Sequence, residues 1–243
     1  MRIEGTHAVV TGANRGLGRA LVEALLERGA SCVYAAGRNR EALKSVFGGR
    51  PQVIPVTLDV TLPHSAQAAS RTCHDADILV NNAAALTHAR LIEAATLDDA
   101  RLEMETNYWG TLNMCRAFAP VLAANGGGAI VNILSMGALA SMPFVGSYCA
   151  SKAAALSLTQ GIRGELAGNG TLVAGVIAGP IQTDMAREHE REGRYPAAMI
   201  AHATLDGIEQ GRTTIYPDPK SQQVGEDFRR DHVAVEEAFG KIV

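Results

Sequence analysis

The sequence is poor in lysine, in aromatic residues and in long apolar runs. Its 243 residues include four lysines, five tyrosines and one tryptophan, and the formal net charge is −3. Such a chain does not predict the basic surface of a nucleic-acid-binding protein. No apolar run reaches the roughly 18 residues that a membrane-spanning helix needs. The N-terminal MRIEGTHAVV also lacks the apolar core of a signal peptide, so we expect a cytoplasmic protein that binds neither nucleic acid nor membrane.

Paired cysteine motifs are missing as well. The four cysteines, Cys32, Cys73, Cys115 and Cys149, show no C-x-x-C spacing, and the seven histidines are scattered. This pattern predicts free, buried thiols in a reducing compartment and no metal site. The charged run AREHEREGR around His189 is typical of a solvated helix face rather than of a ligand cluster.

Short apolar runs alternate with helical patterns over the first half of the chain. The strand-like runs are THAVVTG, CVYAAGR, VIPVTLDV and ADILVNNA, and helical segments such as LGRALVEALLERGA separate them. This alternation is typical of βαβ units, in which helices cover both faces of a parallel sheet. We therefore expect an α/β fold: a Rossmann-type, doubly wound, mostly parallel seven-stranded sheet.

The second half continues the pattern and then loosens. It predicts helices over 98–124, 148–167, 196–210 and 221–240, and strands at AIVNILS, TLVAGVIAG and TTIYP. The charged, irregular stretch after Pro180 suggests a substrate lid over 184–200. Because repeats and linkers are missing, we expect one domain over 1–243.

The first strand leads directly into a glycine-rich turn. In TGANRGLG, Gly12, Gly16 and Gly18 lie where the strand gives way to a helix. Backbone N–H groups at the start of a helix can bind the pyrophosphate of a dinucleotide, and glycine allows its close approach. The spacing differs from G-x-G-x-x-G, and a tight turn needs glycine even without a ligand. The position after the first strand of a βαβ unit favours the cofactor site.

Two arginines bear on which dinucleotide binds. Arg15 lies within the glycine turn, and Arg38 follows the second strand, where the adenosine ribose would lie. A carboxylate at that place would favour NAD, whereas a guanidinium can pair with a 2′-phosphate. We therefore predict NADP(H) as the cofactor. The alternative is that both arginines are solvated loop residues.

A tyrosine and a lysine one helical turn apart form a candidate catalytic pair. Tyr148 and Lys152 occur in SYCASK, and Ser135 lies thirteen residues upstream at the end of a strand. A neighbouring ammonium favours the phenolate, so Lys152 should lower the pKa of Tyr148 from about 10. Asn107, in the helix predicted over 98–124, is a further candidate. Alternatively, Ser135 only caps a turn, and Asn107 is only a polar residue tolerated in a helix.

Taken in order along residues 6 to about 185, these motifs resemble the short-chain dehydrogenase/reductase family, in its single-domain subgroup of about 250 residues. The resemblance includes TGANRGLG, Asp59-Val60, the NNAA stretch at 81–84 and AGPIQT at 178–183. Ala84 replaces a family glycine and Ala178 a family proline, which leaves local loop geometry open. The candidate cofactor-binding residues are Gly12, Asn14, Arg15, Gly16, Leu17, Gly18, Arg38, Asp59, Val60, Asn82, Ala83, Ala84, Tyr148, Lys152, Gly179, Ile181 and Thr183.

The resemblance also implies a catalytic tetrad of Asn107, Ser135, Tyr148 and Lys152. Tyr148 would act as general acid in reduction and as general base in oxidation, with Ser135 bound to the substrate oxygen. By resemblance, Lys152 would hold the nicotinamide ribose, and Asn107 would hold a water that connects the lysine to solvent. The family also suggests a homodimer or homotetramer.

The predicted function is NADPH-dependent reduction of a small-molecule carbonyl, reversible to alcohol oxidation. We expect an apolar ketone or aldehyde, because Met136, the stretch 140–144, Met185, Tyr195 and Met199 should wall the pocket. The alternative is that these side chains belong to the core. Two other functions stay open: an NAD-linked alcohol oxidiser of the same family, and a non-catalytic dinucleotide-binding sensor or scaffold.

Overall fold

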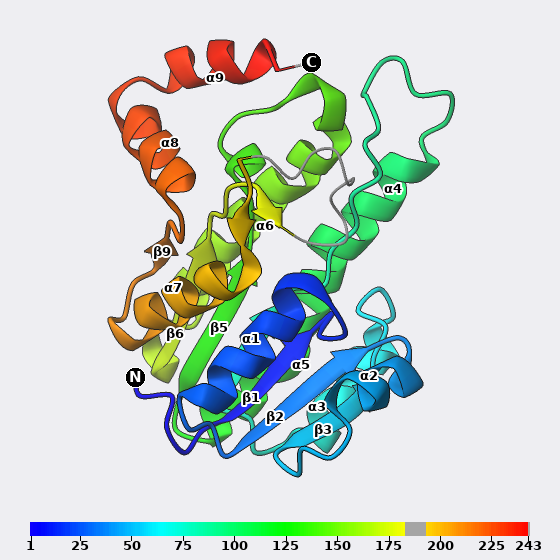
Figure 1. The fold of residues 1–243 in the computed structure, drawn as a ribbon, viewed down its shortest axis with the longest axis vertical. Coiled ribbons are helices and arrows are strands. Elements are labelled where there is room, and N and C mark those ends of the chain that lie inside the picture. The colour runs from blue at the N-terminus through cyan, green and yellow to red at the C-terminus, as the bar shows by residue number, and fades with distance from the viewer. Residues whose placement is uncertain (183–192, 243) are drawn as a thin grey trace.

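A computed structural model describes residues 1–182 and 193–242, and its centre is a seven-stranded parallel sheet (Figure 1). The strand order is β3-β2-β1-β4-β5-β6-β9, and all neighbours in the sheet run parallel. The strands are β1 (His7–Thr11), β2 (Cys32–Gly37), β3 (Val53–Thr57), β4 (Ile78–Asn81), β5 (Gly128–Ile133), β6 (Thr171–Val176) and β9 (Thr214–Ile215). The predicted seven-stranded, Rossmann-type sheet is confirmed.

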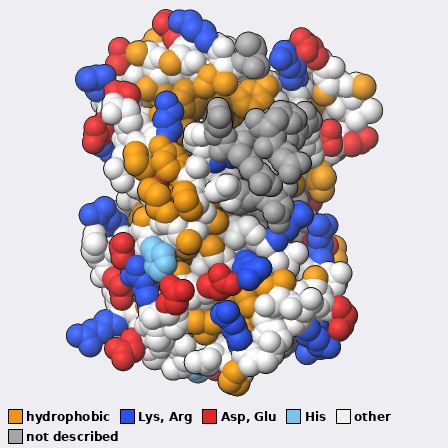
Figure 2. All heavy atoms as spheres, viewed as in Figure 1, with side chains coloured by type: hydrophobic (Ala, Val, Ile, Leu, Met, Phe, Trp, Pro, Cys, Tyr) orange, Lys and Arg blue, Asp and Glu red, His pale blue; other side chains and the backbone are white. Residues whose placement is uncertain are grey.

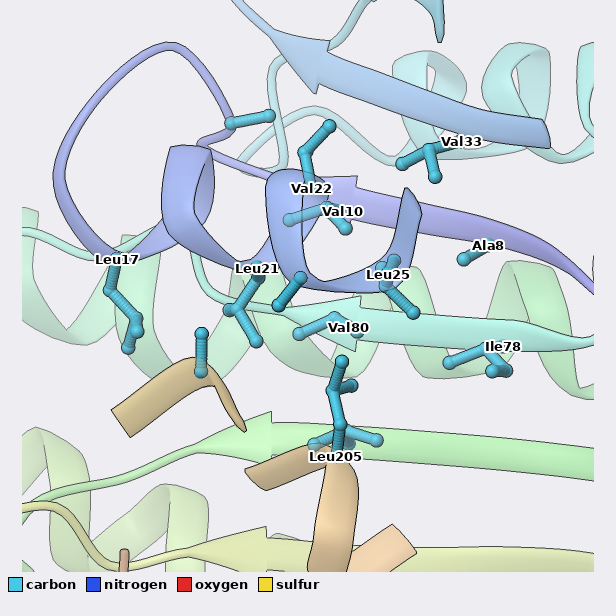
Figure 3. Packing of buried hydrophobic residues seen from close by; sticks show 14 of the residues in the cluster. Ala8, Val10, Leu17, Leu21, Val22, Leu25, Val33, Ile78, Val80 and Leu205 are labelled. Atoms are coloured by element: carbon cyan, nitrogen blue, oxygen red, sulfur yellow. The ribbon is translucent and has the colours of Figure 1, made fainter. Parts of the chain in front are cut away.

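Helices cover both faces of the sheet, as predicted. On one face, α1 (Gly16–Glu27), α2 (Arg40–Phe47) and α7 (Ala197–Glu209) pack in a common apolar cluster with β1, β2 and β4. In Figure 3, Leu21 and Leu25 of α1 project onto the strands beside Leu205 of α7. The other face is covered by α3 (Pro63–Thr72), α5 (Thr111–Ala124) and α6 (Gly146–Glu165).

The predicted long helix over 98–124 is continuous but not uniform. It begins as α4 (Asp98–Met104), widens into a π-helical segment (Glu105–Gly110) and continues as α5. Single π turns inside α-helices occur frequently at functional sites. Here the π segment contains Asn107.

The C-terminal prediction of one helix over 221–240 is wrong. The chain forms two helices there, α8 (Pro219–Arg230) and α9 (His232–Gly240), which lie beyond the upper end of the sheet (Figure 1). Asp231 breaks the helix because its backbone is extended and its carboxylate accepts a hydrogen bond from the Ala234 N–H at 3.0 Å. An N-terminal cap of this kind starts a new helix.

Short elements complete the described chain. They are the paired strands β7 (Ile181–Gln182) and β8 (Tyr195–Pro196), and 3₁₀ turns at Met136–Ala138, Pro143–Val145 and Ala167–Asn169. Most of the segment predicted as a lid, residues 184–192, lies outside the described residues. Its remainder forms β8 and the start of α7.

The face shown in Figure 2 divides into two halves. Basic and acidic side chains interleave over the lower half, and hydrophobic side chains gather over the upper half. The upper half corresponds to the end of the molecule where α8 and α9 lie in Figure 1. Among the described helices, none combines the length and the apolar character needed to span a membrane.

Candidate active site

A cavity of about 460 Å³ runs along the carboxyl ends of the strands, which point upward in Figure 1. Ligands of open α/β sheets bind at this edge. Residues from the ends of five adjacent strands, β3, β2, β1, β4 and β5, line it together with α6. The predicted cofactor residues that line it are Gly12, Asn14, Arg15, Gly16, Leu17, Gly18, Arg38, Asp59, Val60, Asn82, Ala83, Ala84, Tyr148 and Lys152.

The glycine turn has the geometry that its composition predicts. Gly12 and Gly16 have φ values of +65° and +53°, in the left-handed region that favours glycine. A Cβ on Gly18 would lie 2.2 Å from the carbonyl oxygen of Gly12, so this position excludes any side chain. At Arg15, the N-cap of α1, no side chain caps the helix. The first backbone N–H groups of α1 are therefore available to a phosphate.

Asn82 holds the turn from the neighbouring strand. Its side-chain Nδ2 donates to the carbonyl oxygens of Thr11 at 2.9 Å and Gly12 at 3.3 Å. The Thr11 hydroxyl accepts the backbone N–H groups of Asn82 and Ala83, each at 2.9 Å. These bonds tie the ends of β1 and β4 together, so Asn82 has a clear part in shaping the cavity floor.

The two arginines lie where the sequence predicts. Arg15 and Arg38 both line the cavity and are exposed, and neither pairs with an acidic side chain among the described residues. Asp59, after β3, is held by Thr61, whose N–H and hydroxyl donate to its Oδ1 at 3.0 and 2.7 Å. This end of the cavity therefore offers two unpaired guanidinium groups beside a fixed loop.

Tyr148 and Lys152 line the other end of the cavity, and Ser135 lies beside Tyr148 without being one of the lining residues. The Lys152 Nζ lies 5.7 Å from the centroid of the Tyr148 ring and donates to the Ile133 carbonyl oxygen at 2.8 Å. The Ser135 hydroxyl lies beside the Tyr148 phenol, whose pKa it lowers, and it accepts the Gly137 N–H at 3.1 Å. A carbonyl oxygen placed beside the phenol would thus meet two hydroxyl groups.

The predicted lowering of the Tyr148 pKa is wrong for the chain itself. Burial raises the pKa of Tyr148 to about 12 and outweighs the opposing effect of the hydrogen bond with Ser135. Burial also lowers the pKa of Lys152 to about 8. In the chain without cofactor, burial therefore decides the pKa of Tyr148.

Asn107 is buried behind this pair rather than exposed in the cavity. Its Oδ1 accepts the N–H of Ala85 at 2.9 Å, and its Nδ2 donates to the Ala85 carbonyl at 2.9 Å and to the Ser151 hydroxyl at 2.8 Å. It therefore contacts the segment after β4 and the residue before Lys152. The prediction that it holds a water stays a prediction.

Two of the described cofactor candidates do not line the cavity, and a third lies outside the described residues. Gly179 and Ile181 are not among the lining residues, and Thr183 lies outside the described residues. Gly179 is fixed by its N–H, which donates to the buried carboxylate of Asp218 at 2.8 Å. This bond ties the loop after β6 to the start of α8.

The predicted apolar wall belongs mostly to the core. Met136 and Ala140 are buried in a cluster with Val224, Val235 and Phe239 of α8 and α9. Tyr195 packs against another core cluster, Met199 is 37% exposed, and Met185 lies outside the described residues. The error arose because the sequence does not show that α8 and α9 cover the stretch after β5.

Other residues line the cavity that sequence reasoning missed. They include Leu86, Thr87, Leu102 and Thr106. Their signal in the sequence is weak, since they are ordinary apolar and hydroxyl residues. Only their position beside the NNAA stretch and before Asn107 could have indicated them.

Comparison with known proteins identifies the family. A family model described as short chain dehydrogenase matches residues 6–193. The chain belongs to this family. It is 37% identical to a sorbitol dehydrogenase of Cereibacter sphaeroides over 187 residues, which are 74% of this chain and 72% of that protein. It is 31% identical to the 3-oxoacyl-(acyl-carrier-protein) reductase FabG of Vibrio harveyi over 87% of this chain and 85% of that protein.

Solved structures of short-chain dehydrogenases share the fold over nearly the whole chain. One from Burkholderia cenocepacia, in complex with NADP, has a TM-score of 0.92 and 42% identity, covering 98% of this chain and 99% of that one. Another from Burkholderia phymatum, in complex with NAD, has a TM-score of 0.84 and 25% identity, covering 95% and 96%. The protein is therefore an oxidoreductase that acts on CH–OH or C=O groups with a nicotinamide dinucleotide.

Proposed function

We propose that this short-chain dehydrogenase reduces the carbonyl group of a small molecule with NADPH. The observation that supports this best is that Tyr148 and Lys152, with Ser135 beside Tyr148, line one end of a cavity. The other end of the cavity is a glycine turn flanked by two arginines. The cavity fits a dinucleotide because the first N–H groups of α1 have no side-chain cap from Arg15, and because the turn before them is packed too tightly for a Cβ on Gly18.

The proposed roles follow from the geometry. NADPH, when bound, supplies a hydride to the carbonyl carbon, and the chain supplies the proton that the oxygen then needs. Tyr148 donates that proton, and Ser135 hydrogen-bonds the same oxygen. Lys152 and Asn107 would restore the proton, and Lys152 would hold the ribose next to the nicotinamide.

In the chain without cofactor, Tyr148 is in the protonated state that reduction requires. Because burial raises its pKa to about 12, the phenol carries its proton at neutral pH and is ready to donate it. Oxidation would need the phenolate, which forms only when the ammonium of Lys152 acts more strongly than it does in the chain alone. Lys152, with a pKa lowered to about 8, is still mostly charged at pH 7.

The preference for NADPH is supported by Arg38 and Arg15. Both are exposed at the cavity, and an unpaired guanidinium beside the adenosine ribose can bind a 2′-phosphate. The 42% identical Burkholderia cenocepacia protein was solved with NADP. The 25% identical Burkholderia phymatum protein was solved with NAD, which keeps the direct comparison of the two cofactors essential.

For the substrate we propose an uncharged ketone or aldehyde. Leu86, Leu102, Ile133 and Leu134 line the cavity near the catalytic end and provide apolar contacts. A second candidate is NAD-linked oxidation of a polyol, favoured by the 37% identity to a sorbitol dehydrogenase. A non-catalytic sensor is the third alternative, and the assembled Tyr148, Ser135 and Lys152 argue against it.

A substrate panel with both cofactors tests the proposal. Ketones, aldehydes and 3-oxoacyl thioesters would be offered with NADPH and NADH, and sorbitol and other alcohols with the oxidised cofactors. We expect turnover of an uncharged carbonyl with NADPH. The Tyr148→Phe variant should lose turnover and keep cofactor binding. Sorbitol oxidation with NAD alone would favour the second candidate, and undiminished turnover of the variant would exclude the proposed role of Tyr148.

We also propose that the protein forms a homodimer or homotetramer in the cytoplasm. Leu102 and Trp109 are 49% and 47% exposed on the continuous helix that contains Asn107, which leaves apolar surface for a second copy. The four free cysteines fit a reducing compartment. Sedimentation velocity of the wild type and of Trp109→Glu would test the assembly.

A further inference from the structure

A buried carboxylate lies next to the candidate active site and has no part in the proposed proton transfer. Glu103 of α4 has 0% of its surface exposed. Its Oε1 accepts hydrogen bonds from the backbone N–H of Thr87 at 2.7 Å and from the Thr87 hydroxyl at 2.8 Å. Its Oε2 accepts a bond of 2.5 Å from the Ser147 hydroxyl. Glu103 therefore joins the segment after β4 to the residue that precedes Tyr148.

Among the described residues, Glu103 makes one of two side-chain hydrogen bonds between α6 and the helix that begins with α4. Glu103 and Asn107 lie four residues apart, and so do their partners on α6, Ser147 and Ser151. The two interhelical bonds measure 2.5 Å for the first pair and 2.8 Å for the second. Each serine is followed directly by one of the two proposed catalytic residues of α6.

The same two side chains hold the segment after β4. Asn107 binds the N–H and the carbonyl of Ala85, and Glu103 binds the N–H and hydroxyl of Thr87. Alternate residues of an extended segment point to the same side. The helix thus fixes residues 85 and 87 in the way that a neighbouring strand would.

The fixed segment contains a residue in an unfavourable backbone conformation. His88 has φ +59°, the left-handed region that non-glycine residues adopt rarely. Thr87 before it is held by Glu103, and the Ala89 carbonyl after it lies 3.3 Å from the Ser147 hydroxyl oxygen, whose single hydrogen it shares with Glu103. The His88 ring then stacks on Phe144 at a centroid distance of 6.4 Å. The contacts of Glu103 and Ser147 therefore set where this ring pair lies.

Stability alone does not explain an ionisable group at this place. Among the described residues, no cation pairs with Glu103, and its three hydrogen bonds come from neutral donors. A buried carboxylate without a cationic partner is expensive compared with an apolar side chain of similar volume. Such a group is retained where it fixes the geometry of a site.

We propose that Glu103 is a positioning residue for the reduction. Its carboxylate holds the 85–89 segment and the start of α6 in the relative position that brings the substrate carbonyl to Tyr148. This inference rests on the proposed function, because the reaction at Tyr148 is part of that proposal.

Two variants separate the effect of the Glu103 hydrogen bonds from the effect of its charge. In Glu103→Gln, the amide oxygen can still accept from Thr87, and the amide nitrogen can donate to Ser147, whose hydroxyl still donates to Ala89. We expect its kcat to stay within about threefold of wild type. Glu103→Met has a similar volume and makes none of these bonds, so we expect kcat to fall by about tenfold to a hundredfold, with unchanged affinity for NADPH.

The pH dependence of kcat provides a second measurement, which should not change if Glu103 only stabilises the fold. Lys152 lies 5.7 Å from the centre of the Tyr148 ring, and the groups that influence the pKa of Tyr148 are Ser135 after β5, Cys149 on its own helix and Glu103 from α4. Burial raises the pKa of Tyr148 most, and Cys149 and then the negative charge of Glu103 raise it to a smaller extent. Removing this charge in Glu103→Gln should therefore move the basic limb of the kcat profile to lower pH.

A distant carboxylate provides the matched control. Asp75 accepts the Tyr34 hydroxyl at 2.8 Å at the opposite, amino end of β4, so Asp75→Asn should change stability without changing the pH profile. Wild-type kcat and pH profile in Glu103→Met would overturn the inference, even if that variant melted at a lower temperature.

Hydrogen exchange keeps the test independent of turnover. We expect the Thr87 amide to lose protection in Glu103→Met and to keep it in Glu103→Gln. Unchanged protection in Glu103→Met would overturn the positioning role whatever the activity. A wild type that converts nothing in the substrate panel would instead overturn the proposed function, and the exchange result would still show whether Glu103 fixes the segment.

Discussion

The side chains of Asn107 and Ser151 are joined by a 2.8 Å hydrogen bond between neighbouring helices, and both are buried. The Ser151 hydroxyl also donates to the Tyr148 carbonyl at 2.7 Å. Ser151→Ala removes both bonds and leaves one amide hydrogen of Asn107 without this partner. We expect the free energy of unfolding to fall by about 1–3 kcal/mol, measured by urea denaturation. Ser70→Ala, at a half-buried serine of α3 whose hydrogen bond to the Gln67 carbonyl is exposed to solvent, should change it by less than about 0.5 kcal/mol.

The glycine turn predicts a contrast between two glycine-to-alanine changes. A Cβ at Gly18 would lie 2.2 Å from the Gly12 carbonyl oxygen and 2.6 Å from the Asn82 side chain, whereas Gly161 in α6 has open space. Gly18→Ala should destabilise the protein by about 2 kcal/mol or more and abolish NADPH binding. Gly161→Ala should stabilise it by about 0.5–1 kcal/mol and leave binding unchanged. Thermal unfolding and cofactor fluorescence check both, and intact binding in Gly18→Ala would contradict the assignment of the turn.

The buried Lys152 predicts a pH-dependent stability difference. Its pKa falls from 10.5 to about 8 on folding, so between these pH values the unfolded chain binds more protons than the folded one. Stability contributed by this group therefore rises with pH across that window. Relative to Lys152→Met, the cofactor-free wild type should gain up to about 3 kcal/mol between the lower and upper limits. A difference in unfolding free energy that stays constant from pH 7 to pH 10.5 would contradict the lowered pKa.

The position of Arg38 predicts that the protein binds NADPH more tightly than NADH. Its exposed guanidinium lines the cavity beyond β2, where the adenosine ribose would lie. Arg38→Ala should weaken NADPH binding by about 1.5–3 kcal/mol, the usual contribution of a charge-assisted hydrogen bond, and leave NADH binding nearly unchanged. Titration of cofactor fluorescence measures both affinities. Arg40→Ala, at the exposed start of α2, is the matched control, and equal losses for both cofactors in Arg38→Ala would argue against 2′-phosphate recognition.

Much of the fold is predictable because its signals are local. Buried strands such as VVT and ILVN are almost wholly apolar, and the glycine turn marks the passage from β1 to α1. Tyr148 and Lys152 are predictable as a pair because one helical turn separates them. The pKa of Tyr148 is not predictable in this way, because it depends on burial by residues far away in the sequence.

Most of the errors arise from contacts between distant segments. Met136 and Ala140 belong to the core because α8 and α9 cover them, which no pattern near residue 136 indicates. The break at Asp231 did carry a local signal, a capping residue before a new helical pattern. The burial of Glu103 is not predictable from the sequence because a glutamate in a helix is usually exposed. Only its packing against α6 buries it.

The π-helical segment at Glu105–Gly110 has a consequence for the whole helix from Asp98 to Ala124. Each residue of an α-helix turns it by about 100°, so one extra residue in a wide turn changes the rotational setting of all that follows. Glu103 and Asn107 can then face α6, while Met114, Phe118 and Leu122 face the sheet. Deleting one residue within this segment would restore a regular helix and force one of these two sets to turn away from its partners.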